Sequence, residues 1–195
     1  GGISERDTVT TDVESNPNLF DPPNVTKTVD GSGFPVLTYE AVLINSGNAP
    51  AEDVMFTDPI PDNTTYVEGS IFLNGSPVSD ADGFTGSAVQ VTIPEIDAGG
   101  GEAKIVFSVR VDSGFYGTIS NQGTVSIPGT SFPDEPTDDP NTDPENDPTD
   151  YKIAPPPPPT PVPSLGTWAK ILLAASFLGL GLWTLGRNRE EDYVG

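Results

Sequence analysis

The amino-acid sequence predicts an all-β domain over residues 23–130, and three observations carry this prediction. Short runs rich in apolar and β-branched residues recur at close spacing, clusters of Gly, Pro, Asn, Asp and Ser separate them, and no stretch of the region shows a helical period of 3.6. Seven or eight such strands in roughly 105 residues fit an immunoglobulin-like β-sandwich, with a small barrel as the alternative.

The expected strands alternate between apolar and polar side chains, as strands with one buried face do. In the run AKIVFSVRV, residues Ile105, Phe107 and Val109 share one face, whereas YEAVLI is apolar on both faces, as is typical of a central strand. In chain order the expected strands are NVTKTV, PVLTYEAVLI, DVMFTD, TTYVEG, SIFLNG, AVQVTI, AKIVFSVRV and TISNQGTVSI.

The segments that flank this region have a different composition. Residues 1–22 are polar and interrupted by prolines, so we interpret them as a linker, or as the tail of a preceding repeat with DTVTTDV as its last strand. The chain begins without methionine and shows no signal peptide, so we expect it to be the C-terminal piece of a longer polypeptide.

Residues 131–163 are rich in acids and prolines, and Lys152 is their single base. Like charges repel and proline stiffens the chain, so the composition predicts a disordered, extended and solvated spacer. Calcium binding is the alternative, but the carboxylate spacing does not fit an EF-hand loop and the prolines oppose wrapping around an ion.

The overall composition excludes several kinds of chemistry. The chain has no cysteine and no histidine, which rules out disulfides, thiolate metal sites and histidine acid–base catalysis. Its net charge of −21 argues against nucleic-acid binding, which needs clustered Lys and Arg. We therefore expect no nucleic-acid partner, no cofactor and no metal ion.

The segment 164–195 predicts a single membrane-spanning helix at about 167–186. The run from Ile171 to Leu185 is free of charge, and with its flanks it approaches the roughly 20 residues that cross a bilayer. Trp168 and Trp183 lie near its two ends, where interfacial aromatic residues belong.

Arg187 and Arg189 follow this apolar run directly. By the positive-inside rule they place the C-terminus in the cytoplasm, so the β-domain is expected outside the cytoplasm and the inner membrane is an expected partner.

Three polar side chains occupy the apolar faces of three separate expected strands: Lys27, Asp58 and Asn121. A buried charge is costly unless it is paired, so three such groups on inward faces call for a common explanation. Their apolar neighbours on the same faces are Val25 and Val29 for the first strand, Val54, Phe56 and Ile60 for the second, and Ile119, Val125 and Ile127 for the third.

These three residues suggest an intramolecular isopeptide bond. Burial lowers the pKa of a lysine and raises that of an aspartate. A neutral Lys27 amine could then attack the Asn121 side-chain carbonyl, while a protonated Asp58 polarises that carbonyl and shuttles protons as ammonia leaves. The order of Lys on the first strand and Asn on the last resembles that of self-cross-linked sandwiches in Gram-positive pilins and adhesins.

Two alternatives remain open for Lys27. It could form a buried ion pair with Asp58, to which Asn121 is hydrogen-bonded, with no covalent chemistry. It could instead lie on an edge strand and extend to water. Glu40 is the alternative to Asp58 as the acid, although it lies on the opposite face of its strand from the residues expected to point inward.

Residues 23–128 also carry four short motifs: a Lys-Thr-Val start, Y…NSGNA, TDxxP and a late IxNxxxV. Together they resemble a bacterial surface repeat of unknown function that often occurs in tandem. The resemblance implies an immunoglobulin-like architecture and neighbouring repeats in the same polypeptide as partners.

The stretch VPSLGTWA, followed by an apolar helix and an Arg-containing tail, resembles the IPTL-CTERM sorting signal of Gram-negative surface proteins. The resemblance implies export, transient anchoring in the inner membrane and handling by an exosortase-type transpeptidase, leaving the product on the cell surface or secreted. The positions that match are Val162, Pro163, Leu165 and Trp168, with Ser164 in the place of threonine.

The expected function is therefore not enzymatic beyond a single self-cross-linking turnover: a stalk repeat of an exported, adhesin-type surface protein. The alternative is a carbohydrate- or protein-binding module that uses exposed loops such as SDADGFTG. A carboxylate-based hydrolase is disfavoured because its candidate acids are scattered, mostly in turns: Asp53, Asp58, Asp80, Asp82 and Asp97.

Overall fold

The computed structural model describes residues 15–20, 24–160, 166 and 169–172. The chain divides into two compact units, Gly1–Pro155 and Pro156–Gly195. In the second unit, residue 166 and residues 169–172 are helical. The described residues contain no helix with the length and apolarity needed to span a bilayer, and most of the span predicted at about 167–186 lies outside them.

The described part of the first unit consists of strands and one short helix, α1 (Asp80–Gly83). This confirms the all-β prediction. The strands are β1 (Val25–Asp30), β2 (Val36–Asn45), β3 (Ala51–Pro59), β4 (Thr64–Tyr66), β5 (Phe72–Leu73), β6 (Ser76–Pro77), β7 (Ala88–Ile96), β8 (Gly101–Val111), β9 (Gly117–Asn121), β10 (Thr124–Ser126), β11 (Glu135–Pro136) and β12 (Thr149–Ile153).

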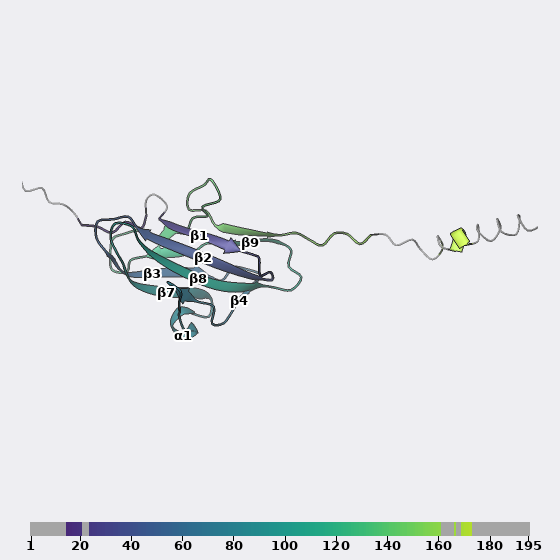
Figure 1. The fold of residues 1–195 in the computed structure, drawn as a ribbon, viewed down its shortest axis with the longest axis horizontal. Coiled ribbons are helices and arrows are strands. Elements are labelled where there is room, and N and C mark those ends of the chain that lie inside the picture. Colours follow the sequence, from purple (N-terminus) through teal and green to yellow (C-terminus); the bar gives the residue numbers. More distant parts are fainter. Residues whose placement is uncertain (1–14, 21–23, 161–165, 167–168, 173–195) are drawn as a thin grey trace, which may run out of the picture. The chain divides into compact units, whose positions relative to one another are not determined.

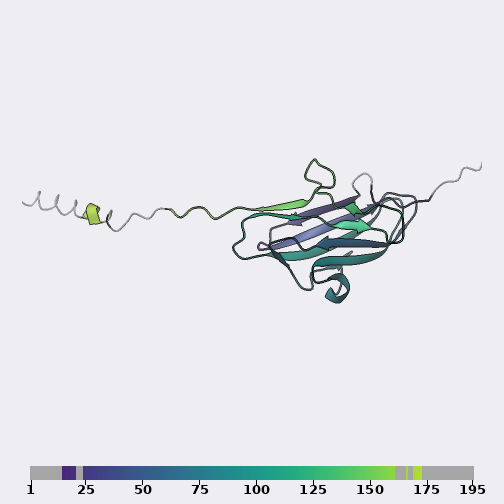
Figure 2. The ribbon, with the colours of Figure 1, turned by 180° about the vertical axis from the view of Figure 1, so that it is seen from behind.

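These strands form two antiparallel layers. One sheet has the order β1-β2-β8-β5-β6, with β4 also paired to β8, and the other has the order β11-β10-β3-β7. Strands β9 and β12 form a separate two-stranded ribbon. Figure 1 shows β1, β2 and β8 side by side with β3 and β7 in the layer beneath, and Figure 2 shows the same layers from behind.

A single hydrophobic core joins the two sheets. The inward face predicted for β8 is buried, and Tyr39 of β2 lies directly opposite Phe107 of β8, with ring centroids 5.3 Å apart. Strand β2 is central, as predicted, between β1 and β8. Its second apolar face is not covered, however, because Ile44 is exposed and Val42 is half-buried.

The segment predicted to be a disordered spacer, 131–163, differs from that expectation over most of its length. Strand β11 pairs with β10, and β12 pairs with β9 along its whole length. We call the segment from β11 to β12, residues 135–153, the strap. The domain thus extends well beyond the boundary predicted at residue 130, whereas residues 154–160 are exposed and lack regular structure.

The strap folds because its backbone completes two sheet edges, which the composition of its side chains does not reveal. Acidic side chains of the strap also accept hydrogen bonds from backbone amides of the same short loop. Asp138 accepts a hydrogen bond from the Asn146 amide at 2.7 Å, and Asp139 accepts one from the Asn141 amide at 3.0 Å.

Candidate cross-linking site

Lys27 lies in the middle of β1, and its side chain is fully buried. It faces the small residue Ala41 across the β1–β2 ladder, which leaves room for a long side chain. The outer edge of β1 is not free, because the Lys27 amide donates to the Asp138 carbonyl at 2.7 Å. The alternative in which Lys27 extends to water from an edge strand is therefore wrong.

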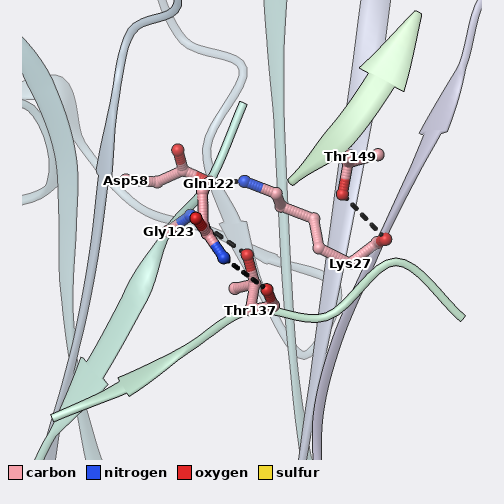
Figure 3. Close-up of polar contacts among 6 residues, drawn as sticks. All are labelled: Lys27, Asp58, Gln122, Gly123, Thr137 and Thr149. Carbon is pink, nitrogen blue, oxygen red and sulfur yellow. Dashed lines mark hydrogen bonds and ion pairs between the residues drawn. The ribbon is translucent and has the colours of Figure 1, made fainter. Parts of the chain in front are cut away.

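Lys27 pairs with Asp58 across the two sheets. Its Nζ lies 2.8 Å from Oδ2 of Asp58, and both side chains are 0 % exposed. Figure 3 shows the lysine side chain running from β1 toward the carboxylate on β3. The Tyr39 ring lies alongside, with its centroid 5.5 Å from Nζ, so apolar and aromatic groups surround the pair.

Asn121, at the end of β9, is also buried, and its environment is unusual. Its Nδ2 makes no hydrogen bond, and neither does Oδ1 of Asp58. The amide still faces the Asp58 carboxylate closely enough for a side-chain interaction that lowers the pKa of Asp58, the smallest of the four effects on that pKa. A buried amide without a partner is costly, and such groups in a folded protein need an explanation.

Burial moves the pKa values of the ion pair toward each other. Desolvation lowers the pKa of Lys27, and the attraction of Asp58 only partly opposes this. Desolvation likewise raises the pKa of Asp58, against the smaller opposing effects of Lys27 and Asn121. Both directions favour the neutral pair of a free amine and a protonated carboxyl, which is the form that nucleophilic attack on an amide requires.

A second set of residues holds this site together, and sequence reasoning missed it. Gly123 approaches the acid so closely that a Cβ there would lie 3.0 Å from Oδ2 of Asp58. Its amide donates to Thr137 Oγ1 at 3.1 Å, and the Gln122 side chain donates to the Thr137 carbonyl at 3.2 Å. Thr149 Oγ1 donates to the Lys27 carbonyl at 3.0 Å (Figure 3).

One signal in the sequence could have found part of this set. A glycine inside a strand pattern indicates a bulge or a close backbone approach, and Gly123 interrupts TISNQGTVSI in that way. No comparable signal marks the two threonines, Thr137 and Thr149, because they lie in the acidic segment that was expected to be solvated.

The other acids considered from the sequence lie elsewhere. Glu40 forms a half-exposed ion pair with Lys104 at 3.1 Å, outside the core. Asp80 accepts hydrogen bonds from the Tyr66 hydroxyl at 2.5 Å and the Gly69 amide at 3.0 Å, so it anchors a loop. Within the described ranges, no three His, Cys, Asp or Glu side chains are grouped as a metal ion would require.

The loop SDADGFTG contributes to a surface cavity of about 430 Å³. Tyr66 and Phe84 stack there with ring centroids 4.1 Å apart, and Glu68 and Asp80 also line it. Burial, followed by the hydrogen bond to Asp80, raises the pKa of Tyr66 to about 12. The carbohydrate- or protein-binding alternative remains a prediction for this loop.

The residues of the predicted sorting signal lie outside the described part of the chain. These are the motif residues Val162, Pro163, Ser164, Leu165 and Trp168 and the basic residues Arg187 and Arg189.

Comparison with known proteins gave structural matches only: no protein-family model and no curated protein matches the sequence. Three solved domains illustrate the structural likeness. The collagen-binding subdomain of the Enterococcus faecalis surface protein ACE is 11 % identical, with a TM-score of 0.44, over 60 % of this chain and 94 % of that one. The N-terminal domain of a Streptococcus gordonii adhesin is 14 % identical, with a TM-score of 0.46, over 70 % and 33 %. The major pilin subunit of Bacillus cereus is 12 % identical, with a TM-score of 0.45, over 63 % and 38 %.

Proposed function

We propose that the β-domain is a self-cross-linking structural module of an exported surface protein, in which an amide bond joins Nζ of Lys27 to Cγ of Asn121. One observation carries this proposal: a fully buried lysine–aspartate pair lies beside a buried amide whose nitrogen has no partner. A purely structural ion pair would leave the cost of that unbonded amide unexplained.

The chemistry needs only the three side chains. The neutral Lys27 amine attacks Cγ of Asn121 while the protonated Asp58 carboxyl donates its proton to the amide. The bond from Cγ to Nδ2 then breaks, and the nitrogen leaves as ammonia after gaining one proton, while the lysine nitrogen loses one proton to Asp58. The carboxyl regains one proton, so the net change is one amide bond exchanged for another and one ammonia released.

The missing hydrogen bond of Nδ2 suits a leaving group. An amide nitrogen held by several acceptors would have to break those bonds before departing, whereas this one is already free of them. The bond would close a loop of about 95 residues, which stabilises the fold by roughly 4–5 kcal/mol in the chain-entropy treatment used for disulfides. It would also carry tension between the first strand and β9 in a chain without cysteine.

The intact mass of the full chain tests this proposal. The mass of the folded wild-type chain is expected to be lower by one ammonia than the mass calculated from its sequence. Proteolysis should yield a branched peptide that joins Lys27 to Asn121. An unmodified mass in the folded chain would exclude the cross-link.

The rate of cross-linking is expected to be level around neutral pH and to fall on both sides. Below the acid limb, Lys27 and Asp58 are both protonated and the amine cannot attack; above the alkaline limb, both are deprotonated and the acid is lost. Because burial raises the pKa of Asp58 and lowers that of Lys27, the limbs should lie above pH 3.8 and below pH 10.5, the ordinary values of the two groups.

This profile can be measured by diluting denatured, unreacted full chain into buffers of different pH and following ammonia loss per folded molecule by mass. Circular dichroism reports the folded fraction in the same samples. A rate that keeps increasing up to pH 10.5 would mean that Lys27 titrates as an ordinary solvated amine, contrary to the proposal.

The repeat and sorting motifs support a wider role: a stalk repeat, next to neighbouring repeats, that is exported, anchored in the inner membrane and processed by an exosortase-type enzyme. With an export signal and a tag placed after Gly195, the tag should be removed only in a host that has such an enzyme. Pro163→Ala should prevent removal, and equal tag retention with and without the enzyme would refute processing.

A further inference from the structure

We infer that the strap is a working part of the cross-linking site: it positions Lys27 against Asn121, with Thr149 as the positioning residue, so the bond forms only once the strap has docked. This inference rests on the proposed cross-link. Its evidence is independent of the ion pair, because it comes from hydrogen bonds made by residues 137–149.

Thr149 connects the strands that carry the two reacting side chains. In the β9–β12 ladder it lies directly opposite Asn121, which fixes the backbone of the amide-bearing residue. Its Oγ1 donates to the carbonyl of Lys27 at 3.0 Å, which fixes the backbone of the amine-bearing residue (Figure 3). The side chain is 1 % exposed, so water does not compete for this bond.

The first half of the strap makes a second connection between the same two regions. The backbone carbonyl of Asp138 accepts from the Lys27 amide at 2.7 Å, and its backbone amide donates to the Val25 carbonyl at 2.9 Å. These two bonds fix the backbone of β1 at the lysine. The adjacent Thr137 donates its amide to the Gly123 carbonyl at 2.9 Å and accepts from the Gly123 amide at 3.1 Å. Gly123 follows Asn121 by two residues, so residues 137–138 link both sides of the site.

The sheet topology makes these links decisive. In the described part of the chain, β1 pairs along its length with β2, and β9 pairs only with β12. Strands β1 and β9 are therefore held together through the strap and not by a ladder of their own. Without the strap, the Lys27 amide would lose its acceptor and water could reach the ion pair. The amine would then regain an ordinary affinity for protons and spend less time as a nucleophile.

The strap can be loosened at a point remote from the reacting groups. The Tyr151 ring of β12 lies so close to Gly31 that a Cβ on this glycine would overlap the ring at 2.2 Å. Gly31→Ala must therefore push Tyr151 outward without touching Lys27, Asp58 or Asn121. The backbone of Gly31 lies outside the left-handed region, so alanine adds no strain of its own.

The experiment compares cross-linking rates of full-length variants refolded from denaturant, with ammonia loss followed by mass and expressed per folded molecule. Thr149→Val, which removes the hydroxyl but keeps the shape, is expected to react about tenfold more slowly, the equivalent of one buried hydrogen bond. Thr149→Ser should restore the rate, and Gly31→Ala should slow it. Thr64→Val is the matched control, since its Oγ1 donates to the Pro61 carbonyl at 2.7 Å away from the site.

The pH profile distinguishes positioning from general destabilisation. If the strap excludes water from Lys27, Thr149→Val and Gly31→Ala should lower the level part of the rate profile and widen it. The acid limb then moves to lower pH and the alkaline limb to higher pH, because hydration returns the pKa values of Asp58 and Lys27 toward their ordinary values of 3.8 and 10.5. A wild-type chain that reacts while both variants react at the same rate with an unchanged profile would overturn the strap inference alone. A wild-type chain that folds and never loses ammonia would overturn the cross-link and the inference with it.

Discussion

Replacing Asn121 with alanine is expected to abolish ammonia loss completely, while the same change at Asn45 leaves it intact. The comparison is sharp because both asparagines are buried in the same domain. Asn45 is fully bonded: its carbonyl oxygen accepts from the amides of Asn18 and Gly47, and its nitrogen donates to the carbonyls of Ala49 and Ile96. Asn121 Nδ2 has no such bond, which suits a nitrogen that departs.

Intact mass and peptide mapping of the full chain decide this prediction. Lys27→Ala should behave like Asn121→Ala, since either change removes one end of the bond, whereas Asn45→Ala should lose stability by about 1–3 kcal/mol and still react. A cross-link that persists in Asn121→Ala would show that another residue supplies the carbonyl. If the wild-type chain has the mass calculated from its sequence, the cross-link is absent and the remaining interpretation is a buried ion pair with a neighbouring amide.

Asp58→Ala is expected to cause a larger loss of stability than Asn121→Ala. The Asn121 variant loses the cross-link, about 4–5 kcal/mol of unfolding free energy, but keeps the lysine–aspartate pair. The Asp58 variant loses the acid that assists the reaction, so the bond does not form and Lys27 stays buried without its partner. Breaking a buried pair from one side costs a further 3–5 kcal/mol, roughly.

Denaturant unfolding of the wild-type chain and the variants measures this order. The double variant Lys27→Met/Asp58→Ala is the control, because it removes both ionisable groups. It should recover most of the stability that is lost when Lys27 is buried without its partner, but none of the stability that the cross-link provides. Without a covalent bond, Asn121→Ala should cost only about 1–3 kcal/mol, as expected for an ordinary buried polar group, and Asp58→Ala alone should be severe. That outcome would favour the ion pair without chemistry.

The candidate site could be found in the sequence because strand side chains alternate strictly. A polar residue that lies two positions from an apolar residue of a strand's buried face must point inward. This placed Lys27, Asp58 and Asn121 on inward faces without any knowledge of strand pairing. The same alternation gave the inward face of β8, whereas the central position of β2 was predicted from a run that is apolar on both faces. Patterns of this kind report which face of a strand is buried.

They do not report which strands lie next to each other. That Lys27 on β1 reaches Asp58 on β3 in the opposite sheet depends on how the two sheets stack, and this is decided by contacts among residues far apart in the chain. The pKa directions of the pair follow from the same packing, because desolvation requires every surrounding layer to be in place.

From local pattern alone, then, this protein's strands, its inward-facing polar residues and its charge-free C-terminal run could be read, because each depends on neighbours a few positions away. Only the tertiary structure determined that most of the acidic segment is folded against the domain. Acids and prolines predicted solvated chain, yet β1 and β9 each present a backbone edge whose hydrogen-bonding groups need partners, and residues 135–153 supply them. Backbone pairing is indifferent to side-chain composition, so no reading of composition could have shown that Thr149 lies against Lys27.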